Sequence, residues 1–243
     1  MPNNPLNYGT NPNDKTGQDL RSGVIQIQGM FDELFSRWGA NNVLNDFFSV
    51  AAGTNNTCSG DRSAVLGGFG STAAGHRSVV LGGQEAWTRL YGELGFASGK
   101  IATIGDAQCG EFVMRAQTTD ATAKRLTATG FDPWTDNIAN LTDFMAWAAD
   151  VTIIAKRAGN ADCAVWRRPV TLVRTTGSAN TTLVQGTGTA VAPDASNGGG
   201  SAWRMAFAAD TQYGGLSLTF TGAASQTINA VARLSYTQTI TAS

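Results

Sequence analysis

The side chain best suited to proton transfer is a single histidine, His76. With one histidine, two-histidine metal sites are excluded, and a Ser-His-Asp triad would have to be built on His76 itself. His76 stands in a short sequence repeat at the position that Asp61 occupies in the preceding unit. This placement indicates a turn residue on a repeat surface. We therefore expect no catalytic and no metal site at His76.

A cluster of aspartates around Trp134 is the second candidate for chemistry. Asp132, Asp136 and Asp143 lie close together in the sequence. Glycosidases work with two carboxylates beside aromatic platforms, but aspartates in a segment such as FDPWTDN are also ordinary turn residues. Catalysis by these acids and a non-catalytic glycan contact through Trp134 or another tryptophan, such as Trp203, therefore both remain open. We favour the contact, and expect no catalytic residue, no metal, no cofactor and no enzymatic activity.

The composition indicates a β protein rather than a compact enzyme. Charged residues make up 14% of the 243 residues, and there are 29 glycines. Small polar residues are typical of extended β architectures. The net charge of -1 and the lack of a Lys/Arg cluster argue against nucleic-acid binding. We see no signal-peptide pattern and no apolar run of about 20 residues, and expect no membrane insertion.

Near the N-terminus, residues 20–38 have the apolar spacing of a coiled-coil seam. The apolar positions alternate at intervals of four and three residues, which keeps one stripe on one side of a helix. The helix is short and contains two glycines, so it is marginal alone and must pack against something. A surface helix on its own domain is the alternative; we prefer a short three-helix bundle between chains. The proposed interface residues here are Leu20, Val24, Ile27, Phe31 and Leu34.

The most regular pattern is a repeat of fifteen residues. Residues 53–67 read GTNNTCSGDRSAVLG and residues 68–82 read GFGSTAAGHRSVVLG. A fixed short period with one strand signal and one turn signal is typical of a β-solenoid or β-roll. A looser third unit is expected from Gly95 onward, with Trp87, Leu90 and Tyr91 interrupting the repeat. Two or three such turns have little core, so we expect three chains to share one, with Val65, Leu66, Val80 and Leu81 at the trimer interface.

From residue 111 onward the pattern becomes that of ordinary strands. Short β-rich runs are separated by Gly, Asn, Asp and Pro clusters. Many short strands with such turns predict an antiparallel β-sandwich of jelly-roll type.

Three segments resemble known proteins. Residues 9–21, GTNPNDKTGQDLR, followed by Phe31-Asp32-Glu33-Leu34, resemble an N-terminal motif of phage tail fibres. The repeats, with Ser-x-Val-Leu-Gly elements, are similar to the head domain of trimeric autotransporter adhesins of the YadA type, and residues 126–239 resemble the β-rich tip of phage tail proteins. The resemblance implies a virion fibre whose N-terminal motif attaches to the particle and initiates the trimer.

These observations predict a mainly β, homotrimeric virion protein in three parts. Residues 1–50 would form a virion-attachment arm with a trimerising helix, residues 51–110 a YadA-like β-roll collar, and residues 111–243 a β-sandwich tip. The expected function is that of a short phage tail fibre, assembled in the host cytoplasm. It would be held by tail or baseplate proteins and would contact a host-surface glycan or protein receptor. The alternatives are a capsid fibre or decoration protein, and a small glycan-degrading tailspike.

Overall fold

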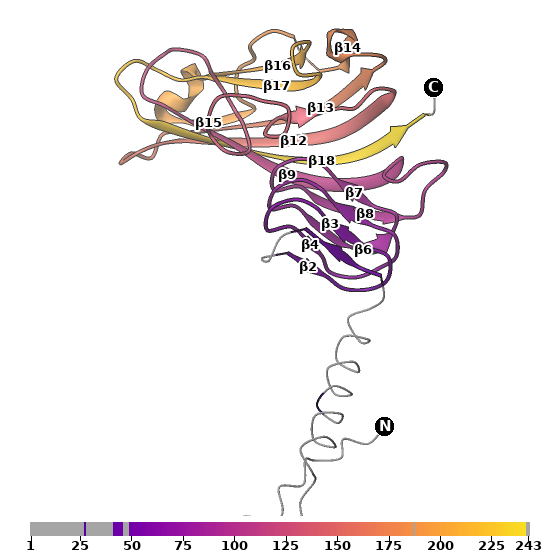
Figure 1. Cartoon of the computed structure of the whole chain (residues 1–243). Coiled ribbons are helices and arrows are strands. Elements are labelled where there is room, and N and C mark those ends of the chain that lie inside the picture. Colours follow the sequence, from indigo (N-terminus) through magenta and orange to yellow (C-terminus); the bar gives the residue numbers. More distant parts are fainter. Residues whose placement is uncertain (1–26, 28–40, 46–48, 187, 242–243) are drawn as a thin grey trace, which may run out of the picture.

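The computed structural model describes residues 27, 41–45, 49–186 and 188–241. In this part of the chain, a short stack of parallel β turns runs directly into a larger region of long antiparallel strands (Figure 1). The stack, residues 43–98, is called the solenoid below.

The solenoid consists of paired short strands on two parallel sheets. One sheet has the order β1-β3-β5-β7, and the strands of the other follow the order β2-β4-β6-β8. Thr57 pairs with Thr72 and Thr72 with Trp87, so successive turns are fifteen residues apart, as the repeat predicts. The bounds are β1 Val43–Leu44, β2 Val50–Ala51, β3 Thr57–Cys58, β4 Ala64–Val65, β5 Thr72–Ala73, β6 Val79–Gln84, β7 Trp87–Thr88 and β8 Leu94–Ser98.

The repeat extends further than its sequence indicates. Trp87, Leu90 and Tyr91 do not interrupt it but form a regular turn stacked on the one before. Gly95, expected to open a third unit, instead pairs with Val80 inside β8. The sequence hides this turn because its side chains differ from those of its neighbours. An earlier turn, β1 with β2, precedes the first recognisable unit.

The spacing between turns is set by glycines with no room for a side chain. A Cβ on Gly60 would lie 2.2 Å from the carbonyl oxygen of Gly75, and one on Gly75 would lie 2.1 Å from that of Leu90. The interior is filled by small residues, among them Val65 and Val80, which are fully buried. The solenoid of one chain is therefore closed around its own narrow core.

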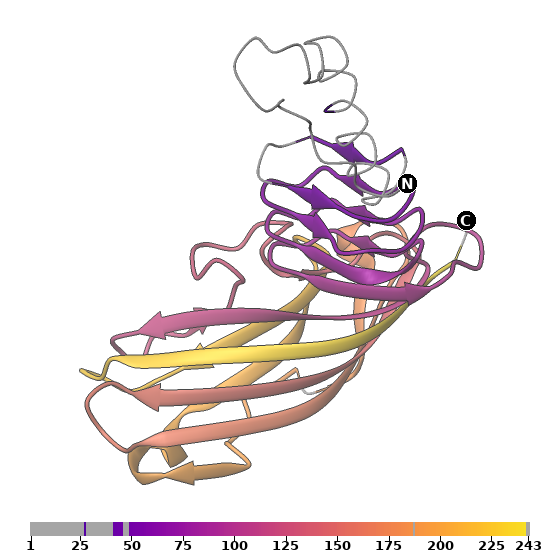
Figure 2. The same ribbon diagram turned by 90° about the horizontal axis from the view of Figure 1, so that it is seen from below.

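Beyond the solenoid, the sheet that contains β8 continues without a break into long antiparallel strands. β9 (Ala107–Thr118) pairs with β8 and with β18 (Ile228–Ile240), which in turn pairs with β12 (Met145–Arg157). β13 (Cys163–Arg174) follows, flanked by β14 (Thr181–Gln185) and β15 (Ala195–Asn197). Figure 2 shows these long strands side by side beyond the solenoid, with β18 in yellow.

A smaller sheet covers one face of the long strands. It contains β10 (Lys124–Arg125), β11 (Ala139–Asn140), β16 (Arg204–Asp210) and β17 (Gly215–Thr221). Between the two sheets lies the main core, where Trp147 stacks on Tyr236 with ring centroids 4.3 Å apart. Alternate residues of the long strands, such as Ile153 and Leu234, point into this core.

The fold class that we expected is wrong in two respects. First, the C-terminal region is no jelly-roll sandwich, because its main sheet is an extension of the solenoid sheet. Two of its strand pairs, β12 with β13 and β16 with β17, are hairpins. Strands of twelve and thirteen residues make up most of this extension, and the last of them, β18, lies between β9 and β12.

Second, the described part of the chain contains no coiled-coil helix. Apart from Ile27, the expected helix at residues 20–38 lies outside the described residues. Elsewhere the described helical segments are two 3-10 helices, η1 (Ser178–Asn180) and η2 (Gly198–Ala202). None of the described helices is long and apolar enough to cross a membrane.

Candidate functional site

Trp134, the predicted glycan contact, lies on an exposed loop formed by residues 131–136. Its side chain is 40% exposed, and that of Phe131 is 75% exposed. Buried Asn137 holds the base of the loop. Its Oδ1 accepts the backbone N–H of Trp134 at 2.8 Å, and its Nδ2 donates to Oγ1 of Thr129 at 2.9 Å. The loop therefore presents two aromatic rings from a fixed base.

The structure separates the other residues that the sequence grouped with Trp134. Trp203 is fully buried and packs edge-on against Phe220, so it cannot contact a host glycan. Asp132 and Asp136 are exposed on the loop, whereas Asp143 lines a separate cleft.

This cleft lies where the last solenoid turn, the end of β13 and the turn between β16 and β17 meet. Its volume is about 720 Å³, within the usual range for ligand pockets. Threonine, serine and amide side chains line much of it. The residues with the most distinctive chemistry in its lining are Trp87, Asp143, Arg174, Gln212 and Tyr213, and Thr135 of the Trp134 loop lies at the same cleft.

Asp143 and Arg174 form an ion pair in the wall of the cleft. Nε of Arg174 donates to Oδ1 of Asp143 at 2.8 Å, and the same oxygen accepts the backbone N–H of Gly177 at 2.9 Å. Nη1 of Arg174 donates to the carbonyl oxygen of Leu141. The guanidinium group is thus fixed at two of its three nitrogens. The side chain of Asp143 remains 40% exposed and that of Arg174 16% exposed.

Gly214 leaves the space that this guanidinium group occupies. A Cβ on Gly214 would lie 2.3 Å from Nη1 of Arg174, and the residue has a φ of +82°. Both the backbone conformation and the close approach favour glycine here. A glycine in the turn of one hairpin therefore determines where an arginine of a distant strand lies.

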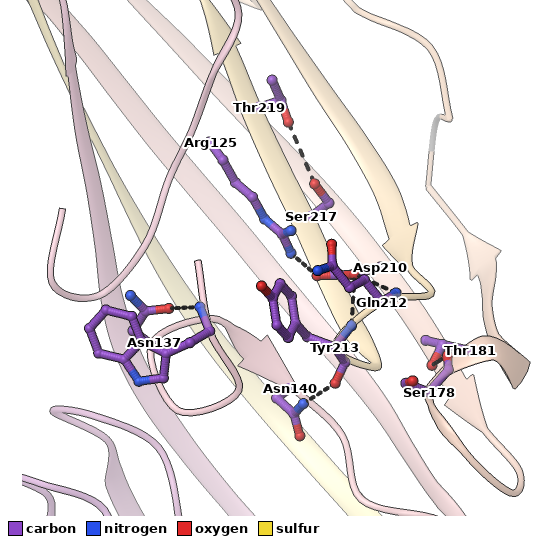
Figure 3. A network of polar contacts seen from close by, with 11 residues as sticks. Arg125, Asn137, Asn140, Ser178, Thr181, Asp210, Gln212, Tyr213, Ser217 and Thr219 are labelled. Carbon is purple, nitrogen blue, oxygen red and sulfur yellow. Dashed lines mark hydrogen bonds and ion pairs between the residues drawn. The ribbon is translucent and has the colours of Figure 1, made fainter. Parts of the chain in front are cut away.

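The turn that carries Gln212 and Tyr213 is organised by the buried carboxylate of Asp210. Oδ1 of Asp210 accepts the backbone N–H groups of Gln212 at 2.9 Å and Tyr213 at 3.0 Å. Its Oδ2 pairs with Arg125 on strand β10. Figure 3 shows this network, with Asn140 donating its side-chain N–H to the carbonyl oxygen of Tyr213. The aromatic ring of Tyr213 is therefore presented from a rigid turn.

A second network of polar contacts stands behind Trp87. The guanidinium carbon of Arg89 lies 5.4 Å from the centre of the Trp87 ring, and Nη2 of Arg89 donates to the carbonyl oxygen of Asn140. Buried Glu93 accepts the backbone N–H groups of Arg89 and Leu90 and the hydroxyl of Tyr236. Burial, together with the nearby Glu93 carboxylate, raises the pKa of Tyr236 well above its ordinary value. Tyr236 therefore stays a neutral donor.

The residues predicted for a trimer interface divide into two groups. Val65 and Val80 face the core of their own solenoid and are fully buried, so they cannot line an interface between chains. Leu66 and Leu81 point outward and are 56% and 51% exposed. Of the helical set, Leu20, Val24, Phe31 and Leu34 lie outside the described residues, and Ile27 is 42% exposed.

Leu81 also borders a second hollow, on the outer face of the long sheet. Its volume is about 620 Å³, and it is lined by Leu81, Phe96, Cys109 and Pro169 among others. Leu66, Leu81 and Phe96 lie on successive turns, with Phe96 opposite Gly82 after a shift in register, and all three are about half exposed. They form an apolar row, called the outer row below, that leads into this hollow.

The cleft has the chemistry of a polar ligand site, and sequence reasoning found little of it. An aromatic ring offers an apolar face, and a carboxylate beside a guanidinium group offers an acceptor next to a donor. Only Asp143 had been singled out; Arg174 and Tyr213 were missed because no local motif surrounds them. The departure of Trp87 from the repeat, where the two preceding turns have Thr57 and Thr72, was the available signal. Among the described residues, no group of three His, Cys, Asp or Glu could hold a metal ion.

No model of a known protein family matches the chain, and no curated protein matches its sequence. Three solved structures show a distant likeness. The first is tailspike gp49 of Acinetobacter baumannii bacteriophage Fri1, described as a capsular polysaccharide depolymerase, with 7% identity over 80% of this chain and a TM-score of 0.31. The tailspikes of A. baumannii phage AM24 and Acinetobacter phage vB_ApiP_P1 have identities of 11% and 9%, coverages of 72% and 82%, and TM-scores of 0.28 and 0.27.

The chain spans 37%, 33% and 39% of the length of these three tailspikes. At such TM-scores the likeness does not define a shared fold. The Fri1 protein is described as a depolymerase, and we do not retain the expectation that this chain has no enzymatic activity. These three structures are phage tailspike proteins.

Proposed function

We propose that this chain is a tail protein of a bacteriophage and that it recognises a host-surface polysaccharide at the cleft between the solenoid and the long sheet. One observation carries the glycan proposal: the same cleft holds the aromatic rings of Trp87 and Tyr213 together with the Asp143–Arg174 pair. Sugars present apolar C–H faces and polar hydroxyl edges, so they suit a site that combines apolar and polar groups. The phage assignment is supported by the N-terminal motif at residues 9–21 and by the repeat.

Replacing Tyr213 with alanine is expected to weaken binding to host-surface polysaccharide about tenfold or more, because an aromatic contact within a pocket is worth about 1.4 kcal/mol or more. Binding can be measured by calorimetry with polysaccharide isolated from a susceptible strain. Phe69→Ala is the matched control, since Phe69 is 47% exposed on the solenoid and does not line the cleft. Equal affinity of the Tyr213→Ala and Phe69→Ala variants would rule out the cleft as the site.

Cleavage of the bound polysaccharide is the second candidate function. It is favoured by the partly exposed carboxylate of Asp143 beside aromatic rings, an arrangement that glycosidases use. Glycosidases need a second acid, and exposed Asp136 is adjacent to Thr135, which lines the cleft. Sizing the polysaccharide before and after incubation with the protein distinguishes cleavage, which shortens the polymer, from binding alone.

We also propose that the protein acts as a homotrimer on the virion, held by its N-terminal part, residues 1–50. The outer row, Leu66, Leu81 and Phe96, supports association because apolar side chains on three successive turns are left uncovered by the chain itself. Three copies of a weak glycan site would bind a polymer far more tightly than one, through effective concentration.

The double substitution Leu66→Asp and Leu81→Asp is expected to reduce the oligomer to a chain of 25.4 kDa. Placing two carboxylates per chain in an apolar interface costs more free energy than the contact provides. Light scattering at micromolar concentration measures the mass. Val113→Asp serves as control, since Val113 is 52% exposed on β9 and is not part of the outer row. A wild-type protein that is already monomeric would contradict the trimer.

A further inference from the structure

We infer that the ligand of the cleft is an uncharged saccharide, held through two neighbouring hydroxyl groups by Asp143 and Arg174. This inference rests on the proposed glycan binding and adds the chemical class of the sugar. It starts from the charges of the cleft. Among the described residues that line it, Asp143 and Arg174 are the charged ones, and they are paired with each other. The cleft wall is therefore close to electrically neutral.

The charges around the cleft do not add a positive field. Arg89 lies behind Trp87, and buried Glu93 lies close enough to offset its charge. Asp136 is exposed and follows Thr135, which lines the cleft, so it adds a negative charge close to the cleft. A sugar carboxylate in the cleft would therefore lie near the carboxylate of Asp143, and like charges in a pocket oppose binding.

The bonding of Arg174 disfavours the usual way of holding a carboxylate. Arginine binds carboxylates with two parallel N–H···O bonds, which need two nitrogens on one edge of the guanidinium group. Here Nε is bonded to Asp143 and Nη1 to the carbonyl oxygen of Leu141. Nη1 carries a second N–H, but Gly214 lies against that side of the group, and among the described residues Nη2 has no hydrogen bond. The N–H groups of Nη2 therefore remain to donate to sugar hydroxyl oxygens.

The atoms left open suit a pair of hydroxyl groups. Oδ1 of Asp143 accepts two hydrogen bonds, whereas its Oδ2 has no partner among the described residues. Because Nε of Arg174 lies 2.8 Å from the same carboxylate, the free acceptor and the free donor are neighbours. Adjacent sugar hydroxyls offer one donor and one acceptor at a similar separation. The hydroxyl groups of Thr142 and Ser178 in the lining can complete such contacts.

The test uses an array of oligosaccharides of about four to eight units, composed either of neutral hexoses and N-acetylhexosamines or of uronic and sialic acids. We expect the wild-type protein to retain neutral members, with affinity nearly independent of salt, since no counterions are displaced. In Asp143→Asn, Arg174 loses its partner charge. Affinity for neutral members should then fall about tenfold, and affinity for acidic members should rise by a similar factor at low salt.

The outcomes separate the two proposals. Preferential binding of acidic oligosaccharides by the wild-type protein, weakened by salt, would overturn the inference and leave glycan binding at the cleft intact. No binding of either class would overturn the proposed function and the inference together. Asp132→Asn is the control, because Asp132 is an exposed aspartate that does not line the cleft. If it changes the preference as Asp143→Asn does, the inference fails.

Discussion

Replacing Glu93 with alanine is expected to lower the free energy of unfolding by about 3–5 kcal/mol, the usual cost of removing one partner from a buried charged network. The carboxylate of Glu93 is 1% exposed and accepts three hydrogen bonds, from the backbone of Arg89 and Leu90 and from the hydroxyl of Tyr236. Without this carboxylate, the three donors have no hydrogen-bond acceptor. The substitution also leaves the charge of Arg89 uncompensated, with a buried Nε that has no hydrogen-bond partner. Urea unfolding followed by tryptophan fluorescence at fixed protein concentration measures the change.

Glu93 also links the solenoid to the long sheet, so its loss is expected to destabilise both. The two preceding turns of the solenoid have serine here, Ser63 and Ser78, and the glutamate of the last turn reaches Tyr236 on β18. Because β8 and β9 also pair directly, we expect the solenoid and the long sheet to unfold in one transition. Asp61→Asn is the control, since Asp61 forms a solvent-exposed ion pair that is worth about 0–1 kcal/mol. A loss below about 1 kcal/mol for Glu93→Ala would contradict this account.

Gly75→Ala is expected to destabilise the protein by about 3 kcal/mol or more, at the upper end of the usual cost of overpacking. The new Cβ would lie 2.1 Å from the carbonyl oxygen of Leu90 and 2.7 Å from its carbonyl carbon. Both are backbone atoms of the next turn, so they cannot move aside without pulling apart the parallel pairing of β5 with β7 and of β6 with β8. Circular dichroism during thermal unfolding measures the loss.

The chain provides a matched control for this glycine. Gly67 lies in the same solenoid, has no heavy atom within 4 Å of its would-be Cβ, and does not have a positive φ. Gly67→Ala should therefore be neutral or slightly stabilising, by about 0.4–1 kcal/mol, because alanine restricts the unfolded chain. If Gly75→Ala and Gly67→Ala lower the stability equally, the intrinsic backbone preference of alanine would explain the effect. The close approach of Gly75 to the next turn would then not matter.

Contacts along the chain explain which parts of the site could be predicted. The exposure of Trp134 follows from a local turn, in which Asn137 three residues later fixes the loop. The Asp143–Arg174 pair joins residues 31 apart, Asn140 reaches Tyr213 across 73 residues, and Glu93 reaches Tyr236 across 143. No periodicity connects positions so distant. The burial of Trp203 was missed for the same reason, since its neighbour Phe220 belongs to another strand.

By itself, the sequence determined the β character of the chain and the fifteen-residue period of the solenoid. In a stack of parallel turns each residue pairs with its equivalent one period away, so Val65 pairs with Val80 as the repeat requires. Only the tertiary structure decided that the last turn continues into a long antiparallel sheet, and that a cleft lies where the two meet. This continuation depends on the pairing of β9 with β8 and with β18. Their partners are far apart in the chain, so which pairings form depends on how the whole core is filled.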